Sequence, residues 1–107
     1  MKLIIAIVSK DDSSAVTSTL TEHGYFITKL ATTGGFLKAG NTTFLIGTDD
    51  EKVPEVVELI KAESSRRTEI VPATATFDAA HYAAYPIEIQ VGGATIFILN
   101  VEEFIKA

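Results

Sequence analysis

The stretch KLIIAIV, residues 2–8, decides how the rest of the chain is organised. After Lys2 it is an unbroken apolar run, mainly of β-branched residues, and it has the length of a strand. Such a run is typical of a strand that is buried on both faces and lies in the middle of its sheet. We therefore expect Lys2–Val8 to be the central strand, and the other segments are candidates to pair with it or to cover it.

A helix is expected directly after this strand. Asp11, Asp12 or Ser13 can cap its beginning, because short polar side chains accept hydrogen bonds from the first free backbone N–H groups. The helix should run to His23. Gly24 then suits the position after a helix end, where a positive φ is favoured.

Two further strands are expected on either side of a glycine-rich tip. Tyr25–Thr32 and Thr42–Thr48 are rich in β-branched and aromatic residues, which favour strands. Thr33–Asn41 interrupts this pattern with glycines. The sequence thus predicts a hairpin with a long tip.

The second helix carries the clearest periodicity in the chain. Asp49 or Asp50 can cap it, and Pro54 falls in its first turn, where proline is tolerated. Its apolar residues recur at i, i+3, i+4 and i+7, the spacing of one helix face; they are Val53, Val56, Val57 and Ile60.

The last part of the chain is expected to hold strands around a long loop. Glu69–Val71 can begin a strand, and Pro72–Tyr85 has no regular period, which in a compact domain is typical of a functional or mobile loop. Pro86–Val91 and Ala94–Val101 are strand-like, with Gly92-Gly93 as a turn or bulge between them. We expect these two strands to pair as an additional C-terminal hairpin.

The order of these elements predicts the fold class. A βαββαβ series within residues 1–107 favours a single α+β domain of the ferredoxin-like plan, an antiparallel sheet with both helices on one face. The opposite face of such a sheet is bare. Many strand residues here are apolar on both sides, so this face is expected to pack against other subunits.

Composition excludes several classes of function. The net charge of −5 argues against binding the backbone of DNA or RNA, which needs a basic surface. The chain has no cysteine, which excludes disulfides and thiolate chemistry and leans toward the cytosol. The apolar run at the N-terminus is too short for a signal peptide. No stretch approaches the roughly 20 apolar residues of a membrane span.

The segment Ala31–Phe44, ATTGGFLKAGNTTF, is the leading candidate for a ligand site. Its glycines let the backbone approach a ligand, and successive N–H groups can form an anion nest. Phe36 and Leu37 are larger and more apolar than a hairpin tip needs, and an aromatic ring there can stack on a base. The alternative is a long tip whose Phe36 and Leu37 fold back on the core. The spacing is not that of a phosphate-binding P-loop.

The remaining motifs favour structural roles. Gly92-Gly93 with Phe97 could bring backbone and an aromatic wall to a ligand, but a bulged hairpin with a core phenylalanine explains them better. Arg66-Arg67 is expected to complement the dipole of the preceding helix rather than to hold a phosphate. His23 and His81 lack metal-ligand spacing, and the serines lie near helix ends. No catalytic or metal-binding set is indicated, so an enzyme is disfavoured.

Three longer runs resemble a known family. MKLIIAIV, TKLATTGGFLKAGNTTFLIG and YPIEIQVGGATIFIL are similar to the PII-like cyclic-di-AMP receptors of Gram-positive bacteria, and the similarity extends over nearly the whole chain. It implies a ferredoxin-like, PII-like fold, a cytoplasmic homotrimer with ligand sites between subunits, and a receptor that acts on a downstream protein without catalysis, cofactor or metal. In this family Thr33–Asn41 corresponds to a shortened T-loop and Pro72–Tyr85 to an enlarged B-loop.

The resemblance also implies site residues. Those at positions like the ones that line the family's nucleotide site are Thr28, Gly35, Phe36, Leu37, Asn41, Gly47 and Phe97. The three large apolar side chains would flank adenine, and Thr28, Asn41 and backbone N–H groups would bond to its edge or to the phosphates.

One position departs from the family. Its characterised binders carry Asn-x-Arg where this chain has Gly24-Tyr25-Phe26, so the cation that faces a phosphate is missing. The alternative function is therefore a PII-like interaction module that binds another nucleotide, such as ATP, or has lost cyclic-di-AMP binding.

Overall fold

The computed structural model describes residues 1–30, 40–72 and 86–107, and its centre is the expected strand. β1 (Lys2–Ser9) pairs on one side with β3 (Asn41–Thr48) and on the other with β6 (Ala94–Asn100), in both cases antiparallel. The short β2 (Thr28–Lys29) pairs with the outer edge of β3, which gives the sheet order β2-β3-β1-β6. The prediction of a central strand is confirmed, but within one chain only the face toward the helices is fully buried.

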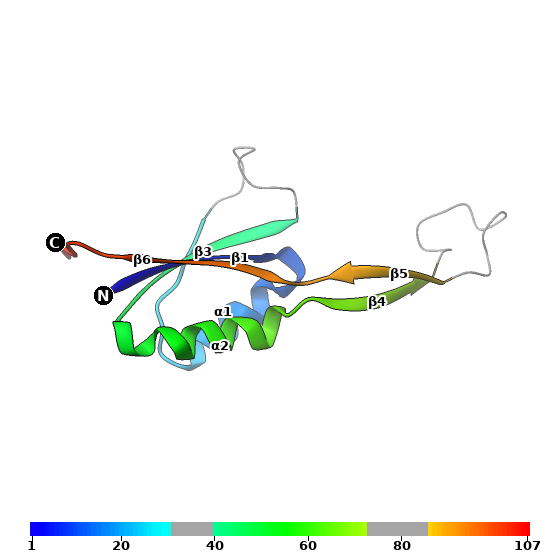
Figure 1. Ribbon diagram of the computed structural model, residues 1–107, viewed down its shortest axis with the longest axis horizontal. Helices are drawn as coiled ribbons and strands as arrows, with labels where there is room; N and C mark the ends of the chain where they lie inside the picture. The colour runs from blue at the N-terminus through cyan, green and yellow to red at the C-terminus, as the bar shows by residue number, and fades with distance from the viewer. Residues whose placement is uncertain (31–39, 73–85) are drawn as a thin grey trace.

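Both helices lie on one face of this sheet (Figure 1). α1 (Ser13–Glu22) follows the 3-10 turn η1 (Lys10–Asp12), and α2 (Val53–Ser64) follows η2 (Asp50–Lys52). Sheet order and helix placement confirm the predicted α+β, ferredoxin-like fold.

The core lies between this helix layer and the sheet. Alternation along β1 and β3 sends every second side chain toward the helices, where they meet one stripe of each helix. The fully buried apolar residues are Ile4, Ala6, Val8, Val16, Leu20, Phe44, Ile46, Val56 and Ile60. Val56 and Ile60 come from the periodic set predicted for the second helix, while Val53 packs at the edge of the core.

The end of α1 is closed as the sequence predicts. Gly24 has a φ of +85°, and its N–H donates to the carbonyl of Thr21 at 3.0 Å. The N–H of Tyr25 donates to the carbonyl of Leu20 at 3.0 Å. These bonds occupy the start of the segment that was expected to be a strand from Tyr25 onward. In the described part of that segment, the ladder with β3 is therefore limited to Thr28–Lys29 and a bond from Leu30 N to Thr43 O.

The predicted pairing of the last two strands is wrong. β5 (Pro86–Val91) pairs with β4 (Arg67–Pro72) in a separate two-stranded sheet, and β6 joins β1 instead. The additional hairpin is therefore an arm inserted between α2 and β6, and it projects beyond the main sheet (Figure 1). The long loop predicted at Pro72–Tyr85 falls almost wholly outside the described residues.

Gly92 and Gly93 explain why β5 and β6 do not pair. Both have positive φ, +77° and +94°, and the N–H of Gly93 donates to the carbonyl of Ser64 at the end of α2. A Cβ on Gly92 would lie 2.6 Å from the carbonyl oxygen of Ser65. The glycines thus turn the chain across the end of α2, so that it leaves the arm and enters the main sheet.

An ion pair fastens the base of the arm to α1. The Arg67 guanidinium donates to both carboxylate oxygens of Asp12, at 2.8 and 3.4 Å, and also to the carbonyl of Ser65 at 3.2 Å. Asp12 is the N-cap residue of α1, but its side chain makes no capping hydrogen bond. The carboxylate raises the pKa of Arg67 further above its usual range. The bond to Ser65 agrees with the predicted role of a cation at the end of the second helix.

Candidate functional site

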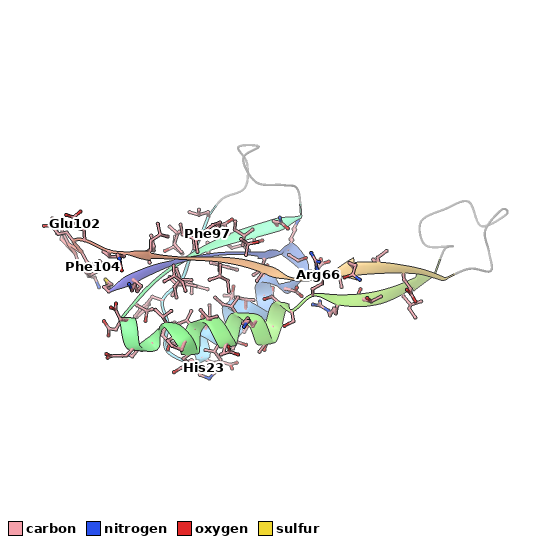
Figure 2. All side chains as sticks on the ribbon, in the orientation of Figure 1. His23, Arg66, Phe97, Glu102 and Phe104 are labelled. Carbon is pink, nitrogen blue, oxygen red and sulfur yellow. The ribbon has the colours of Figure 1, made fainter. Side chains whose placement is uncertain are left out.

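The side of the main sheet that faces away from the helices is largely apolar. Its register aligns Thr28, Leu45, Ile5 and Phe97 in one row across all four strands. We call this side the open face; its large apolar members in the described strands are Leu3, Ile5, Ile7, Leu45, Phe97 and Leu99. Figure 2 labels Phe97 on β6 above this sheet, with the helices on the other side. The side chain of Phe97 is 53% exposed and that of Leu99 is 44% exposed.

The register places four of the predicted site residues on this face, Thr28, Asn41, Gly47 and Phe97, and two of them lie at its opposite edges. Thr28 is on β2 and Phe97 is on β6, and β3 and β1 separate them. At the usual spacing between strands, three steps place the two backbones about 14 Å apart. A single chain therefore brings Thr28 and Phe97 to one surface without joining them in one pocket.

The predicted residues of β3 are also far apart. Asn41 and Gly47 occupy opposite ends of the strand, about 20 Å from each other at the usual rise per residue. Each lines a different groove. Asn41 shares one of about 520 Å³ with Arg66 and the Gly92-Gly93 turn, and Gly47 shares the other with Gly24 and Phe26.

The remaining predicted contacts, Gly35, Phe36 and Leu37, lie outside the described residues, as does His81. Of the candidate segment Ala31–Phe44, the structure describes only the part from Gly40 onward, which leads into β3. The roles assigned to the glycine-rich tip thus stay predictions.

The groove at Gly47 is also lined by an exposed aromatic side chain, that of Phe26. Phe26 is 92% exposed, more than any other large apolar side chain in the described residues. Tyr25 and Ile27 on either side of it pack against the core. The alternation of inward Tyr25, outward Phe26 and inward Ile27 is visible in the sequence, and it could have identified Phe26 as a surface aromatic.

The charged groups near this groove are balanced in sign. Lys52 and Met1, whose ammonium group pairs with Asp50 at 2.9 Å, line it together with Asp49 and Glu55. Burial, and secondly the neighbouring Glu55 carboxylate, raise the pKa of Tyr25 above its usual value of 10.0, so this phenol is neutral at physiological pH. The groove therefore presents an aromatic surface and charges of both signs rather than a concentration of positive charge.

In the residues that the structure describes, His23 has a structural role and no metal-binding group is found. His23 caps the end of α1, with its Nδ1 2.8 Å from the carbonyl oxygen of Thr19, as expected for a residue at a helix end. Among residues 1–30, 40–72 and 86–107, no group of three acidic or histidine side chains could hold a metal ion. In the same residues, neither helix has the length and apolar character to cross a membrane.

Comparison with known proteins identifies the family. An α+β chain with an unpaired apolar sheet face and exposed aromatics has the form of a binding or assembly protein. The family model described as cyclic-di-AMP receptor matches residues 1–107, and the chain belongs to this family. A crystal structure of a functionally unknown protein from Pediococcus pentosaceus is similar over 99% of this chain and 96% of that chain, with 42% sequence identity and a TM-score of 0.76. The resemblance inferred from the three sequence runs is confirmed.

Proposed function

We propose that this protein is a cytoplasmic signalling receptor of a Gram-positive bacterium that binds cyclic di-AMP between the subunits of a homotrimer. It acts on a downstream protein and catalyses no reaction. Family membership supports the ligand. The absence of cysteine is compatible with a reducing compartment.

The separation of Thr28 from Phe97 is the observation that supports a binding site between subunits. The two residues lie on the same face but on opposite edge strands. When two copies pack with unlike edges together, Phe97 of one copy and Thr28 of the next can meet. Because such a contact joins unlike edges, every edge is covered only when the copies form a closed ring, and a trimer is a small ring of this kind.

The apolar open face supports the same arrangement. Leu3, Ile5 and Ile7 are only half-buried in a single chain, and Leu99 beside them is exposed. A contiguous apolar face of this kind in a small protein is typical of a surface that other subunits cover.

Isothermal titration with cyclic di-AMP tests the binding proposal. The wild-type protein should release or absorb heat with saturation, and Phe97→Ala should bind about tenfold or more weakly, because an aromatic wall is lost. Ile98→Ala is the matched control, since Ile98 is the next residue of β6, is similarly exposed and points to the helix side of the sheet. Absence of heat and of a thermal shift at millimolar ligand would contradict the proposal.

A second function is favoured by the surface at Gly24 and Phe26. No cation occupies position 24 or 26, so a phosphate contact expected from the family is missing. A receptor altered in this way could bind another nucleotide, such as ATP, or act as an interaction module without a nucleotide. Parallel titration with ATP separates the first of these possibilities from cyclic-di-AMP binding.

Restoring the family's residues tests the loss of binding. Gly24→Asn combined with Phe26→Arg should create or greatly strengthen cyclic-di-AMP binding if the chain has lost it. The backbone admits this change, because Asn tolerates a positive φ and nothing lies within 4 Å of a Cβ at Gly24. Unchanged binding in the double variant would count against this second function.

A further inference from the structure

The arm formed by β4 and β5 carries free strand edges. Among the described residues these two strands pair only with each other, so each has one edge without a hydrogen-bonded neighbour. The arm projects beyond the main sheet and away from both helices (Figure 1). Alternate N–H and C=O groups along such an edge point outward, and a further strand can bond to them. Because a two-stranded hairpin is only marginally stable alone, a third strand would also stabilise the arm.

The edges of the arm lack the usual protection against such pairing. Natural proteins commonly protect a free edge with lysine, proline or a bulge. β4 and β5 contain no lysine, and their register runs without a bulge. Their prolines are the opposed pair Pro72 and Pro86 at the far end of the arm. Residues 87–91 of β5 therefore keep their N–H groups, and this length is enough for a short added strand.

Each face of the arm combines an isoleucine with a glutamate. Ile70 lies opposite Glu88, and Glu69 lies opposite Ile89. Both isoleucines are exposed, Ile70 at 67% and Ile89 at 40%. Because successive side chains of a strand point to opposite faces, Glu88 and Ile89 lie on different faces of β5. A strand added beside β5 would meet a carboxylate on one face and an apolar side chain on the other.

The outer edge of β5 has a stronger demand for positive charge than that of β4. The carboxylate of Glu69 on β4 already lies 3.9 Å from Nε of Arg67. Glu88 on β5 is exposed and forms no ion pair with the described residues. The side chain of Gln90 is directed across the ladder, where its Nε2 donates to Oγ1 of Thr68 at 3.1 Å. Glu88 is thus the carboxylate that an added strand beside β5 would have to neutralise.

A second copy of this chain is a poorer occupant than a basic segment of another protein. The only cation in β4 and β5 is Arg67, and Asp12 holds it at 2.8 Å. A second arm would therefore bring no free positive charge to Glu88. The net charge of −5 on each copy also opposes the approach of two arms.

We propose that the outer edge of β5 is a docking site for an extended segment of another protein, in which apolar residues alternate with Lys or Arg. The segment adds to the arm as a third strand. Its backbone supplies the hydrogen bonds, while Ile89 and Glu88 select the alternation. This inference rests on the proposed function in one respect, because it takes the segment to belong to the downstream protein.

Three labelled peptides of eight residues test the docking edge on the full chain by fluorescence polarisation. The first peptide alternates valine with lysine, and the second alternates valine with glutamate. The third is the first peptide with proline in place of its two central valines. Wild type should bind the first peptide about three- to tenfold more tightly than the second, because like charges across a strand pair repel. It should bind the third about tenfold or more weakly than the first, because proline cannot continue the ladder.

Reversing one charge on the edge should reverse the choice of peptide. Glu88→Lys should bind the valine–glutamate peptide more tightly than the valine–lysine peptide. Glu103→Lys is the matched control, because Glu103 is also exposed and its substitution changes the net charge equally, but it lies after β6 and outside the arm. This control should keep the order of wild type. Hydrogen exchange of the amides in residues 87–91 should slow with the first peptide and not with the third.

The outcomes separate this inference from the proposed function. If wild type binds cyclic di-AMP but binds the first and third peptides equally, or binds neither, the docking edge is wrong and the proposed function stands. If Glu103→Lys alters the order of the peptides as much as Glu88→Lys does, the attraction is general and the inference is overturned. If light scattering shows assemblies joined in pairs through the arm, a second copy covers the edge and the inference is again overturned. If the peptides bind in the expected order and no nucleotide binds, the docking edge stands and the proposed ligand is wrong.

Discussion

The guanidinium of Arg67 forms an ion pair with the carboxylate of Asp12 through two hydrogen bonds. The carboxylate of Asp12 is almost fully buried, with its side chain 7% exposed, and the guanidinium supplies both of its charged hydrogen bonds. Removing the cation leaves a buried carboxylate without its partner, and that unfavourable state is what a substitution of Arg67 would create.

Arg67→Ala should therefore lower the free energy of unfolding by more than an ordinary surface substitution does, because the Asp12 carboxylate loses its partner. The loss should be smaller than for a fully buried pair, because Arg67 is 44% exposed and water screens the pair. Urea denaturation followed by circular dichroism measures the change. The control is Arg66→Ala at the neighbouring exposed position, which should shift stability by no more than about 0.5 kcal/mol. Equal effects of the two substitutions would show that the ion pair contributes nothing specific.

At the scale of single residues, the sequence predicted the features that depend only on residues nearby in the chain. The buried face of α2 follows from the spacing of Val56 and Ile60, and the positive φ of Gly24 follows from its place after a helix. The partner of Asp12 could not be predicted, because Arg67 is 55 positions away and only the path of the folded chain brings the two together. Asp12 was one of three candidates, with Asp11 and Ser13, to cap this helix, and its carboxylate accepts hydrogen bonds from Arg67 instead.

At the scale of elements, the turn at Gly92 and Gly93 controls which strands pair. The chain passes so close to the end of α2 that the carbonyl oxygen of Ser65 and the guanidinium of Arg67 occupy the space around Gly92. A side chain there meets both an unfavourable backbone conformation and atoms that cannot all move aside.

Gly92→Ala should thus destabilise the protein by about 2–4 kcal/mol, since strain at positive φ and overpacking add together. Its Cβ would lie 2.5 Å from Nη1 of Arg67 and 2.6 Å from the carbonyl oxygen of Ser65. Gly24→Ala is the matched control, because Gly24 also has a positive φ but has nothing within 4 Å of a Cβ. It should cost only about 1–2 kcal/mol. Thermal denaturation compares the two, and an equal loss would mean that the close approach at Gly92 is unimportant.

The predicted pairing of β5 with β6 was wrong for a physical reason. β4, β5 and β6 all show patterns suitable for strands, and such patterns fix which face is buried without fixing the partner. Two glycines between two strands usually indicate a hairpin. Here their positive φ values instead turn the chain across α2, because the bond from Gly93 to Ser64 joins the turn to that helix.

At the scale of the whole molecule, the open face is an apolar surface that no other part of the described chain covers. The sequence predicted an apolar surface opposite the helices from the apolar character of both sides of the strands. It could not specify how many copies would cover that surface in the proposed assembly, because the geometry of closure depends on the angle between subunits. It also could not show that Thr28 and Phe97 lie on opposite edges, since this follows from the strand order.

Introducing a charge on the open face should prevent assembly. Leu99→Glu should convert the proposed trimer to monomers at micromolar concentration, because the interface would have to bury an unpaired carboxylate. Multi-angle light scattering measures the mass directly. Ile98→Glu is the matched control on the same strand, with 48% exposure against 44% for Leu99, and it points to the helix side. A monomeric wild-type protein, or a trimer that tolerates Leu99→Glu, would contradict the proposed assembly.

The hydrogen bond from Gly93 to Ser64 has a consequence beyond pairing. It joins the point where the chain leaves the body to the point where it returns, so the β4–β5 arm is a cassette with both ends at one place. Lengthening a segment between two fixed ends costs little, because its closure entropy grows only with the logarithm of its length. Natural variation can therefore lengthen, shorten or replace this cassette while the ferredoxin-like body stays intact. An engineer can use the same junction to insert a foreign hairpin.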